Sequence, residues 1–250
     1  MGLSSKFKKK LLKETSWSFA TKGVTMVLFI VLNAVLAQQL GPERFGEWSF
    51  FYSILTIVMM LSVFGINISS SKFIAQHHHT PYLGNVIRDG ARLRIMVSVI
   101  FAGVFAALSH PLSQLLNRPG LGDLFLQASP IVLLYGLVEY HKNAYIGLHR
   151  IRYNFIVNIL EHGLKLVFVF LFLQFSLGYF EVVYAFTLAL SVTVLVAGFL
   201  LYKDFYRKQK PRSDAYFTRD ILQFSYPSIF TAAGMLIPRE TDILMLGVLS

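Results

Sequence analysis

The sequence contains no cysteine, and only 14% of its 250 residues are charged. The absence of cysteine excludes a disulfide framework and any thiolate metal site. A soluble domain of this length would carry about a quarter charged residues, so the scarcity of charge indicates that lipid is the main solvent of the chain. A hydrophobic content of 55% and a mean hydropathy of +0.57 point the same way.

Enzyme signatures are also missing. The sequence has no glycine-rich phosphate loop ending in Lys-Ser/Thr, no nucleophile elbow and no His-Glu-x-x-His zinc helix. Its one histidine cluster is His77-His78-His79, whose consecutive side chains do not share a helix face and have no carboxylate near them in sequence. We therefore predict a protein that is not an enzyme, with no cofactor and no metal site.

The formal net charge of +10 first suggests nucleic-acid binding. The Lys and Arg residues, however, lie almost entirely at alternate junctions between apolar runs. This distribution sets the orientation of a membrane protein, so we predict no nucleic-acid partner.

Six apolar runs are long enough to cross a hydrocarbon core, which needs about 20 helical residues. In lipid, backbone amides must pair within the segment, so we expect helices, and no strand-like alternation is present. The predicted spans are 15–39, 48–74, 93–116, 123–147, 154–175 and 181–202. A seventh run begins near 221 and is interrupted at Pro238-Arg239-Glu240, and an eighth starts at Ile243.

The basic residues fix the predicted topology. Eighteen of the 23 Lys and Arg residues lie in the N-terminal arm and in the segments after spans 2, 4 and 6, and only three lie in the opposite loops. By the positive-inside rule the N-terminus is cytoplasmic. The N-terminal lysines followed by an apolar stretch are also typical of a signal peptide. Lys22 interrupts that stretch and five more spans follow, so we do not predict cleavage. We predict a multi-pass protein of the inner (cytoplasmic) membrane.

The spans divide the chain into three parts. We predict an all-α integral membrane fold in which residues 1–202 form a six-helix transmembrane lobe. Residues 203–220 form a cytoplasmic linker, and residues 221–250 begin a second lobe. Because the sequence stops inside an apolar run, it is expected to be a fragment of a longer protein.

Ionisable side chains inside the spans are the main functional signal, because each costs about 2.5–3.5 kcal/mol at a helix centre. Polar side chains gather in the predicted cytoplasmic half of four spans and predict a cytoplasm-facing aqueous cavity. They are Lys22 in span 1, Asn67 and Ser69 to Ser71 in span 2, Glu139, His141, Lys142 and Asn143 in span 4, and Asn154, Asn158, Glu161, His162 and Lys165 in span 5.

Plainer interpretations of these residues remain open at this stage. Lys22 and Lys142 can extend their aliphatic stems to the interface. Glu161 and Lys165 are four residues apart and can simply neutralise each other. His162 can be a hydrogen-bonded packing residue.

Short motifs give the sequence a resemblance to a known family. Leu40-Gly41-Pro42-Glu43-Arg44-Phe45-Gly46 joins spans 1 and 2, and Phe64-Gly65-Ile66 precedes a basic segment. These motifs, with Phe224-Ser225-Tyr226-Pro227 and Thr241 to Gly247, resemble the polysaccharide-biosynthesis (Wzx-type O-antigen) flippases of the multidrug/oligosaccharidyl-lipid/polysaccharide exporter superfamily. The family has two six-helix lobes, so the resemblance implies one lobe plus the beginning of another.

The resemblance implies translocation of a lipid-linked oligosaccharide, on a polyprenyl diphosphate, by alternating access without ATP hydrolysis. The substrate-binding candidates are Lys22, Lys165, Arg239, Asn67 and Asn158, because a diphosphate needs cationic and polar donors. The candidates for a proton or ion relay are Glu139, Glu161 and His162. The expected partners are membrane lipid and a polysaccharide polymerase complex.

Other functions compete with this interpretation. A cation-coupled multidrug exporter of the same superfamily would favour an aromatic, acidic cavity, and a peptidoglycan-precursor flippase would share the anionic cargo. A scaffold for a polymerase complex or an inactive truncated product is a different class. A membrane glycosyltransferase would need acidic residues in a sizeable cytoplasmic loop, and the sequence has none.

Overall fold

The structure, a computed structural model, describes residues 5–63, 65–174, 178–206 and 216–227, which form helices and turns without any strand. The predicted all-α membrane fold is therefore confirmed. The long helices are α1 (Ser5–Val63), α2 (Ile66–Gln76), α3 (Leu83–Leu115), α4 (Gly122–Gly147), α5 (Ile151–Leu173) and α6 (Tyr179–Leu201). The shorter elements are the 3₁₀ turn η1 (Pro119–Leu121), the π-helical turn η2 (Tyr202–Tyr206) and a helix at 218–227.

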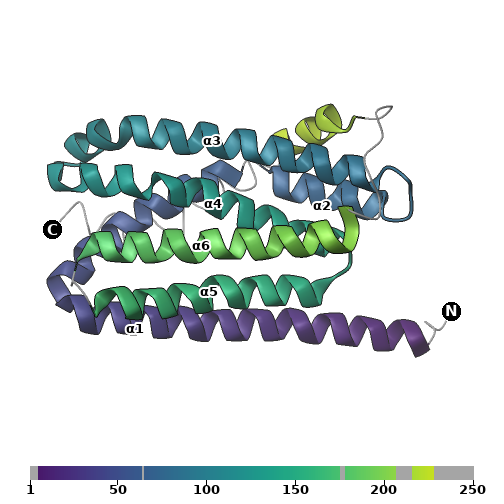
Figure 1. The fold of residues 1–250 in the computed structure, drawn as a ribbon, viewed down its shortest axis with the longest axis horizontal. Coiled ribbons are helices and arrows are strands. Elements are labelled where there is room, and N and C mark those ends of the chain that lie inside the picture. The colour runs from purple at the N-terminus through teal and green to yellow at the C-terminus, as the bar shows by residue number, and fades with distance from the viewer. Residues whose placement is uncertain (1–4, 64, 175–177, 207–215, 228–250) are drawn as a thin grey trace.

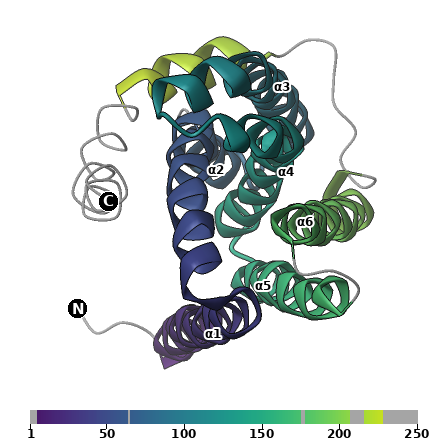
Figure 2. The same ribbon diagram turned by 90° about the vertical axis from the view of Figure 1, so that its left-hand side faces the viewer.

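Helix α1 consists of two helical halves joined at a bend. The chain bends at Gly41, whose φ of 75° is readily adopted only by glycine, and Pro42 starts the second half with its φ already suited to a first helical turn. Figure 2 shows the two halves of α1 diverging from this bend. Residues 40–47, which were expected to connect the first two predicted spans outside either helix, do not form such a loop, because the chain is helical again from Pro42.

The second predicted span is interrupted near its end. Residues 48–74 were expected to form one helix, but α1 ends at Val63 and α2 begins at Ile66. Gly65 lies between them with a φ of 66°, again a left-handed conformation. The glycine of the Phe64-Gly65-Ile66 motif therefore changes the direction of the chain before α2.

Helix α3 starts earlier than predicted. We expected a loop up to residue 92, but α3 begins at Leu83 and carries Arg88 and Arg92 in its first three turns. The charged residues concealed this start, because hydropathy alone does not separate an amphipathic extension from a loop. Helices α4, α5 and α6 lie within three residues of the predicted spans.

The helices form a bundle whose connections alternate between two ends (Figure 1). The start of α1, the turn at 77–82, the α4–α5 turn and the end of α6 lie at one end, which we call the basic end. The Gly41 bend and η1 lie at the other end. The predicted alternation of the spans is therefore present in the structure.

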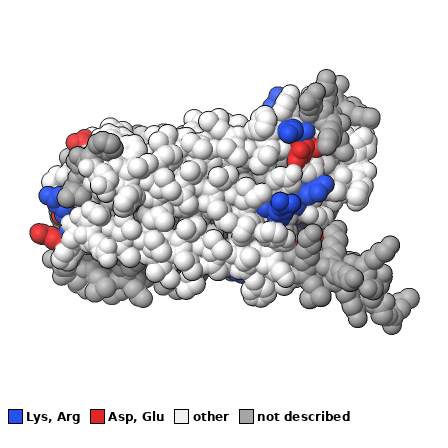
Figure 3. Space-filling view, turned by 60° about the horizontal axis from the view of Figure 1, so that its bottom comes forward, with Lys and Arg blue, Asp and Glu red and all other residues white. Residues whose placement is uncertain are grey.

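The outer surface of the bundle is apolar. Among the described residues, five helices are long and apolar enough to cross a membrane, the first of them running from Glu14 through the Gly41 bend to Gln76. Large side chains such as Ile95, Val99, Val104 and Leu108 on α3 are about half exposed. Figure 3 shows a broad uncharged belt between two charged ends. Such a belt suits a lipid environment, so the chain is a multi-pass membrane protein.

The interior is held by aromatic packing and by tyrosine hydroxyls that reach between helices. Phe51 of α1 stacks on Phe125 of α4, with ring centroids 5.4 Å apart. The Tyr140 hydroxyl donates to the Ile87 carbonyl of α3 at 2.6 Å, and the Tyr145 hydroxyl donates to the Ala197 carbonyl of α6 at 2.8 Å. Helix α4 is thereby fixed at the centre of the bundle.

Residues 216–227 lie against α2 and α3 at the basic end. The buried carboxylate of Asp89 accepts a hydrogen bond from the Phe217 amide at 2.8 Å, and Ile221 packs on Ile66 and Leu93. The ammonium of Lys72 lies 3.6 Å from the ring centre of Phe224. The beginning of the predicted second lobe is therefore anchored to the first six-helix bundle.

A cross-linking experiment tests this anchoring. The hydroxyl oxygens of Ser69 and Ser225 are 2.8 Å apart and both side chains are buried. We expect Ser69→Cys/Ser225→Cys to form a disulfide on mild oxidation, measured as loss of maleimide labelling in the denatured protein. The natural sequence has no cysteine to compete.

The matched control is Ser71→Cys/Ser225→Cys, because Ser71 lies two residues further along α2 and points to a different side of that helix. We expect little cross-linking in the control pair. Equal cross-linking of both pairs would contradict the docking of residues 216–227 on α2.

Candidate functional site

A cavity of about 390 Å³ lies between the two halves of α1, α4 and α5. Its walls come from regularly spaced positions: Trp48, Tyr52 and Thr56 follow at intervals of four on the second half of α1, which places them on one helix face. Phe29 and Asn33 line it from the first half. The bend at Gly41 is what lets both halves of one helix face the same space.

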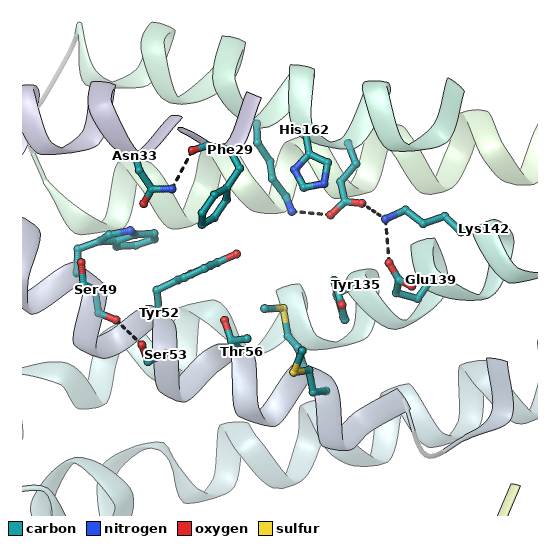
Figure 4. Close-up of a pocket in the computed structure, with 15 residues that line it drawn as sticks. Phe29, Asn33, Ser49, Tyr52, Ser53, Thr56, Tyr135, Glu139, Lys142 and His162 are labelled. Atoms are coloured by element: carbon teal, nitrogen blue, oxygen red, sulfur yellow. Dashed lines mark hydrogen bonds and ion pairs between the residues drawn. The ribbon is translucent and has the colours of Figure 1, made fainter. Parts of the chain in front are cut away.

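The polar wall is a chain of four charged side chains from α4 and α5 (Figure 4). Lys142 Nζ lies 2.8 Å from Glu139 Oε1 and 2.5 Å from Glu161 Oε2. Glu161 Oε1 in turn lies 2.6 Å from Lys165 Nζ. We call Glu139, Lys142, Glu161 and Lys165 the ion-pair chain.

The ion-pair chain is mostly buried. The Glu161 side chain is 2% exposed, and those of Lys142 and Lys165 are 9% and 8% exposed. Removal of charges from water carries a large desolvation cost that only close pairing offsets, and here each buried lysine is paired with a carboxylate. The charges of the two carboxylates and the two ammonium groups also cancel. The ion-pair chain can therefore change its pairing without a change in net charge.

The rest of the cavity wall is aromatic. Trp48 stacks on Tyr52 with ring centroids 5.8 Å apart and meets Phe186 of α6 edge-on at 5.7 Å. The Lys165 ammonium lies 5.4 Å from the Phe186 ring centre. The aromatic groups therefore extend from the charged end of the cavity to Trp48, which lies about 18 Å from Met60 along α1. The cavity thus extends along the second half of α1 beyond the charged residues from which it was predicted.

The structure brings together four of the predicted site residues. Glu139, Glu161, His162 and Lys165 all line the cavity, as the shared depth of their positions predicted. The plainer interpretation of Glu161 and Lys165 as an ion pair also holds, since the two are in direct contact. Their pairing and their place in the cavity wall are therefore compatible.

Other predicted site residues lie elsewhere. Lys22 is an exposed side chain on α1 and does not line this cavity. Asn67 is buried at the start of α2, where its amide makes no hydrogen bond to the described residues. Asn158 is bonded to Asn154 one turn away on α5. Arg239 lies outside the described residues.

Two cations were misplaced by the sequence analysis. Lys142 was expected to extend to the interface, but it is buried at the centre of the ion-pair chain. Its spacing of three residues from Glu139 was the available signal. Arg94 was counted with the basic residues that follow span 2, although it falls just inside the predicted span 93–116. It is fully buried between α1, α3 and α4, and no pattern in the sequence distinguished it from Arg88 and Arg92.

The histidine cluster does not form a metal site in the described part of the chain, where no three His, Cys, Asp or Glu side chains could hold an ion. The His77 ring packs on Phe217, and the His78 ring lies 6.0 Å from that of His149. Partial burial lowers the pKa of His78, and the neighbouring His79 and His149 lower it further. These histidines thus belong to the packing of the basic end.

Comparison with known proteins gives one family and one fold. Residues 11–250 match the sequence profile of a family described as "Polysaccharide biosynthesis protein". No curated protein sequence matches the chain.

Several solved transporters have the same fold. An outward-facing multidrug resistance MATE family transporter of the MOP superfamily aligns with a TM-score of 0.77 and 18% identity, over 92% of this chain and 54% of that one. A MOP superfamily transporter from Pyrococcus furiosus aligns with a TM-score of 0.76 and 18% identity, over 92% and 54%. A eukaryotic MATE transporter aligns with a TM-score of 0.78 and 14% identity, over 97% and 56%. The chain therefore spans about half the length of these transporters.

Proposed function

Since this chain belongs to the polysaccharide biosynthesis protein family, we propose that it is the first lobe of a MOP-superfamily flippase that translocates a lipid-linked oligosaccharide by alternating access, without ATP hydrolysis and without enzymatic activity of its own. The proposed setting is the inner (cytoplasmic) membrane, with the N-terminus and the basic end in the cytoplasm. A polysaccharide polymerase complex is the proposed partner that receives the cargo.

The observation that carries this proposal is the pair of buried lysines in the cavity. Lys142 and Lys165 are held by the same carboxylate, one on each of its oxygens. A diphosphate offers oxygens in a similar bridging arrangement and carries more charge, so it suits both ammonium groups. On this basis Lys142 replaces Lys22 as the partner of Lys165 in the proposed substrate site.

The carboxylates and His162 remain the proposed coupling groups. The Glu161 side chain is 2% exposed and contacts two lysines, whereas the Glu139 side chain is 23% exposed. A cargo that engages both lysines leaves Glu161 without its partners and so favours uptake of a proton or another cation there. Return of the empty transporter would restore the ion-pair chain.

Complementation tests the proposal. In a bacterial strain that lacks its own flippase, we expect Lys142→Ala and Lys165→Ala in the full-length protein to reduce surface polysaccharide at least about tenfold, as expected when a buried charge-assisted contact is removed. The amount of each variant in the membrane fraction is measured in parallel. Lys203→Ala, an exposed lysine after α6, is the matched control and should keep normal export. Normal export by both cavity variants would contradict the anionic-cargo proposal.

A multidrug exporter is the second candidate, because the cavity is aromatic and its lysines are neutralised by carboxylates. Phe29, Trp48, Tyr52 and Tyr135 line it together with Glu139 and Glu161. For a cationic drug the important residues would be the carboxylates, so Glu139→Gln and Glu161→Gln would abolish drug resistance. Two phenotypes of cells that lack the protein separate the candidates. Loss of surface polysaccharide indicates a flippase, whereas loss of resistance to a cationic dye such as ethidium indicates a drug exporter.

A further inference from the structure

The buried residue that the proposed mechanism does not use is Arg94 of α3. It is fully buried, and its guanidinium donates to the Ser62 carbonyl at 2.6 Å and to the Ser62 hydroxyl at 3.2 Å. Its Nε has no hydrogen-bond partner, and no carboxylate oxygen lies within 4 Å of it, in the described part of the chain. A buried charge without an opposite charge in contact is unfavourable, so Arg94 requires an explanation beyond packing.

Lys142 presents the opposite situation, since it contacts two carboxylates, at 2.8 and 2.5 Å. The cluster of Arg94 and the ion-pair chain thus holds three cations and two carboxylates. Its carboxylates are shared unevenly, because Lys142 contacts both of them and Arg94 contacts neither. A redistribution of the same charges would satisfy every cation.

Helix α4 provides the geometry for such a redistribution. The guanidinium of Arg94 lies directly against Gly136, where a Cβ would be only 1.8 Å from Nη2. Glu139 follows Gly136 by three residues and Lys142 follows Glu139 by three, and helical neighbours at this spacing lie about 5–6 Å apart. Glu139 therefore lies between Arg94 and Lys142 on α4, within side-chain reach of both.

We propose that Glu139 is a switch with two ion-pair partners, and that an anion binding at Lys142 transfers the Glu139 carboxylate from Lys142 to Arg94. In this structure Glu139 pairs with Lys142. When an anionic head group takes Lys142, its charge repels Glu139, and Arg94 receives the displaced carboxylate. Arg94 is then a positioning residue that never contacts the cargo.

The switch would report cavity occupancy to the junction with the second lobe. Arg94 is bonded to Ser62, one residue before the end of α1, and its neighbour Leu93 packs on Ile66 and on Ile221 of the anchored segment. A carboxylate arriving at Arg94 weakens its hold on Ser62, because the guanidinium exchanges a neutral acceptor for a charged one. This step rests on the proposed function, since it needs an anionic cargo.

A binding experiment on the purified chain in detergent tests the switch. The probe is farnesyl diphosphate, with farnesol as its uncharged counterpart, and the signal is the fluorescence of Trp48, which lines the cavity. A Trp17→Phe background removes the other tryptophan of this sequence, and loss of the signal in Trp48→Phe assigns it. Four proteins are compared: the parent, Glu139→Gln, Arg94→Gln and the double variant.

If Glu139 is such a switch, Glu139→Gln and Arg94→Gln should change the affinity for the diphosphate in opposite directions, and their effects should not be additive. Glu139→Gln removes the competitor for Lys142, so the diphosphate should bind about tenfold more tightly, a coupling of the usual size between linked sites. Arg94→Gln removes the alternative partner of Glu139, so binding should weaken by about tenfold. In the Glu139→Gln background, Arg94→Gln should change affinity by less than about threefold. Arg92→Gln, an exposed arginine on the same helix, controls for loss of one positive charge and should leave the affinity unchanged.

Two results would overturn the switch. One is equal weakening by Arg94→Gln in both backgrounds, which would make Arg94 a structural or long-range electrostatic residue. The other is unchanged or weaker binding in Glu139→Gln, a variant that tests the proposal even if Arg94→Gln does not fold. If the parent binds farnesol and farnesyl diphosphate equally, the proposed function itself fails. If the parent prefers farnesyl diphosphate to farnesol but the effects of Glu139→Gln and Arg94→Gln on affinity are additive, only the switch is rejected.

Discussion

Replacement of Glu161 by alanine is expected to lower the free energy of unfolding by about 3–5 kcal/mol, the usual effect of breaking a buried ion pair. The carboxylate is 2% exposed and contacts both Lys142 and Lys165. Its removal leaves Lys165 buried without a carboxylate partner in the described part of the chain. Unfolding of the detergent-solubilised protein with sodium dodecyl sulfate, followed by tryptophan fluorescence, measures the change.

The control for this prediction is Glu43→Ala, which removes an exposed glutamate on the same chain and should change stability by less than about 0.5 kcal/mol. A further variant separates stability from function. Replacing all four members of the ion-pair chain (Glu139→Gln, Lys142→Met, Glu161→Leu, Lys165→Met) should restore most of the lost stability, because the apolar groups at the three buried positions carry no desolvation cost and the amide stands at the partly exposed position. If Glu161→Ala were as stable as the parent, the ion-pair chain would be solvated rather than buried.

Replacement of Gly136 by alanine is expected to destabilise the protein by about 1–3 kcal/mol, although alanine is the better helix former. The added Cβ would lie 1.8 Å from Arg94 Nη2 and 2.6 Å from its Cζ. The guanidinium cannot withdraw freely, because it is fully buried and bonded twice to Ser62. The same unfolding measurement in detergent gives the change.

Gly103→Ala is the matched control on α3, since no atom outside its own helix lies within 4 Å of its added Cβ. It should stabilise the protein by up to about 1 kcal/mol, the difference in helix propensity. A double-mutant cycle identifies the clash: in an Arg94→Ala background, the cost of Gly136→Ala should largely disappear. A cost that persists without Arg94 would place the conflict elsewhere.

Much of the fold was predictable because lipid imposes simple rules on a sequence. Apolar runs of sufficient length must be helices, and the predicted limits of α4, α5 and α6 agree with the structure to within three residues. The rules failed where a helix leaves the hydrocarbon. The charged first turns of α3 were taken for a loop, and the break at Gly65 fell inside an apolar run.

The candidate site was predictable only in part. Glu161 and Lys165 could be paired from their spacing on one helix, and Glu139 and His162 were placed at the same depth. The contact between Lys142 and Glu161 joins two helices, and the burial of Arg94 depends on a glycine 42 residues away. Neither contact can be predicted from neighbouring residues in the sequence, because both contacts depend on how α3, α4 and α5 face each other.

The sequence by itself determined that this chain is a bundle of membrane-crossing helices with its ionisable groups at a common depth, because the cost of exposing backbone and charge to lipid is a local property of each segment. The partner of each charge was decided only by the tertiary structure. Two lysines share one carboxylate, Arg94 has no such contact in the described part of the chain, and Lys22 is exposed on the outside of α1. Pairing depends on distances between helices, and these are set by the bend at Gly41 and by packing around α4.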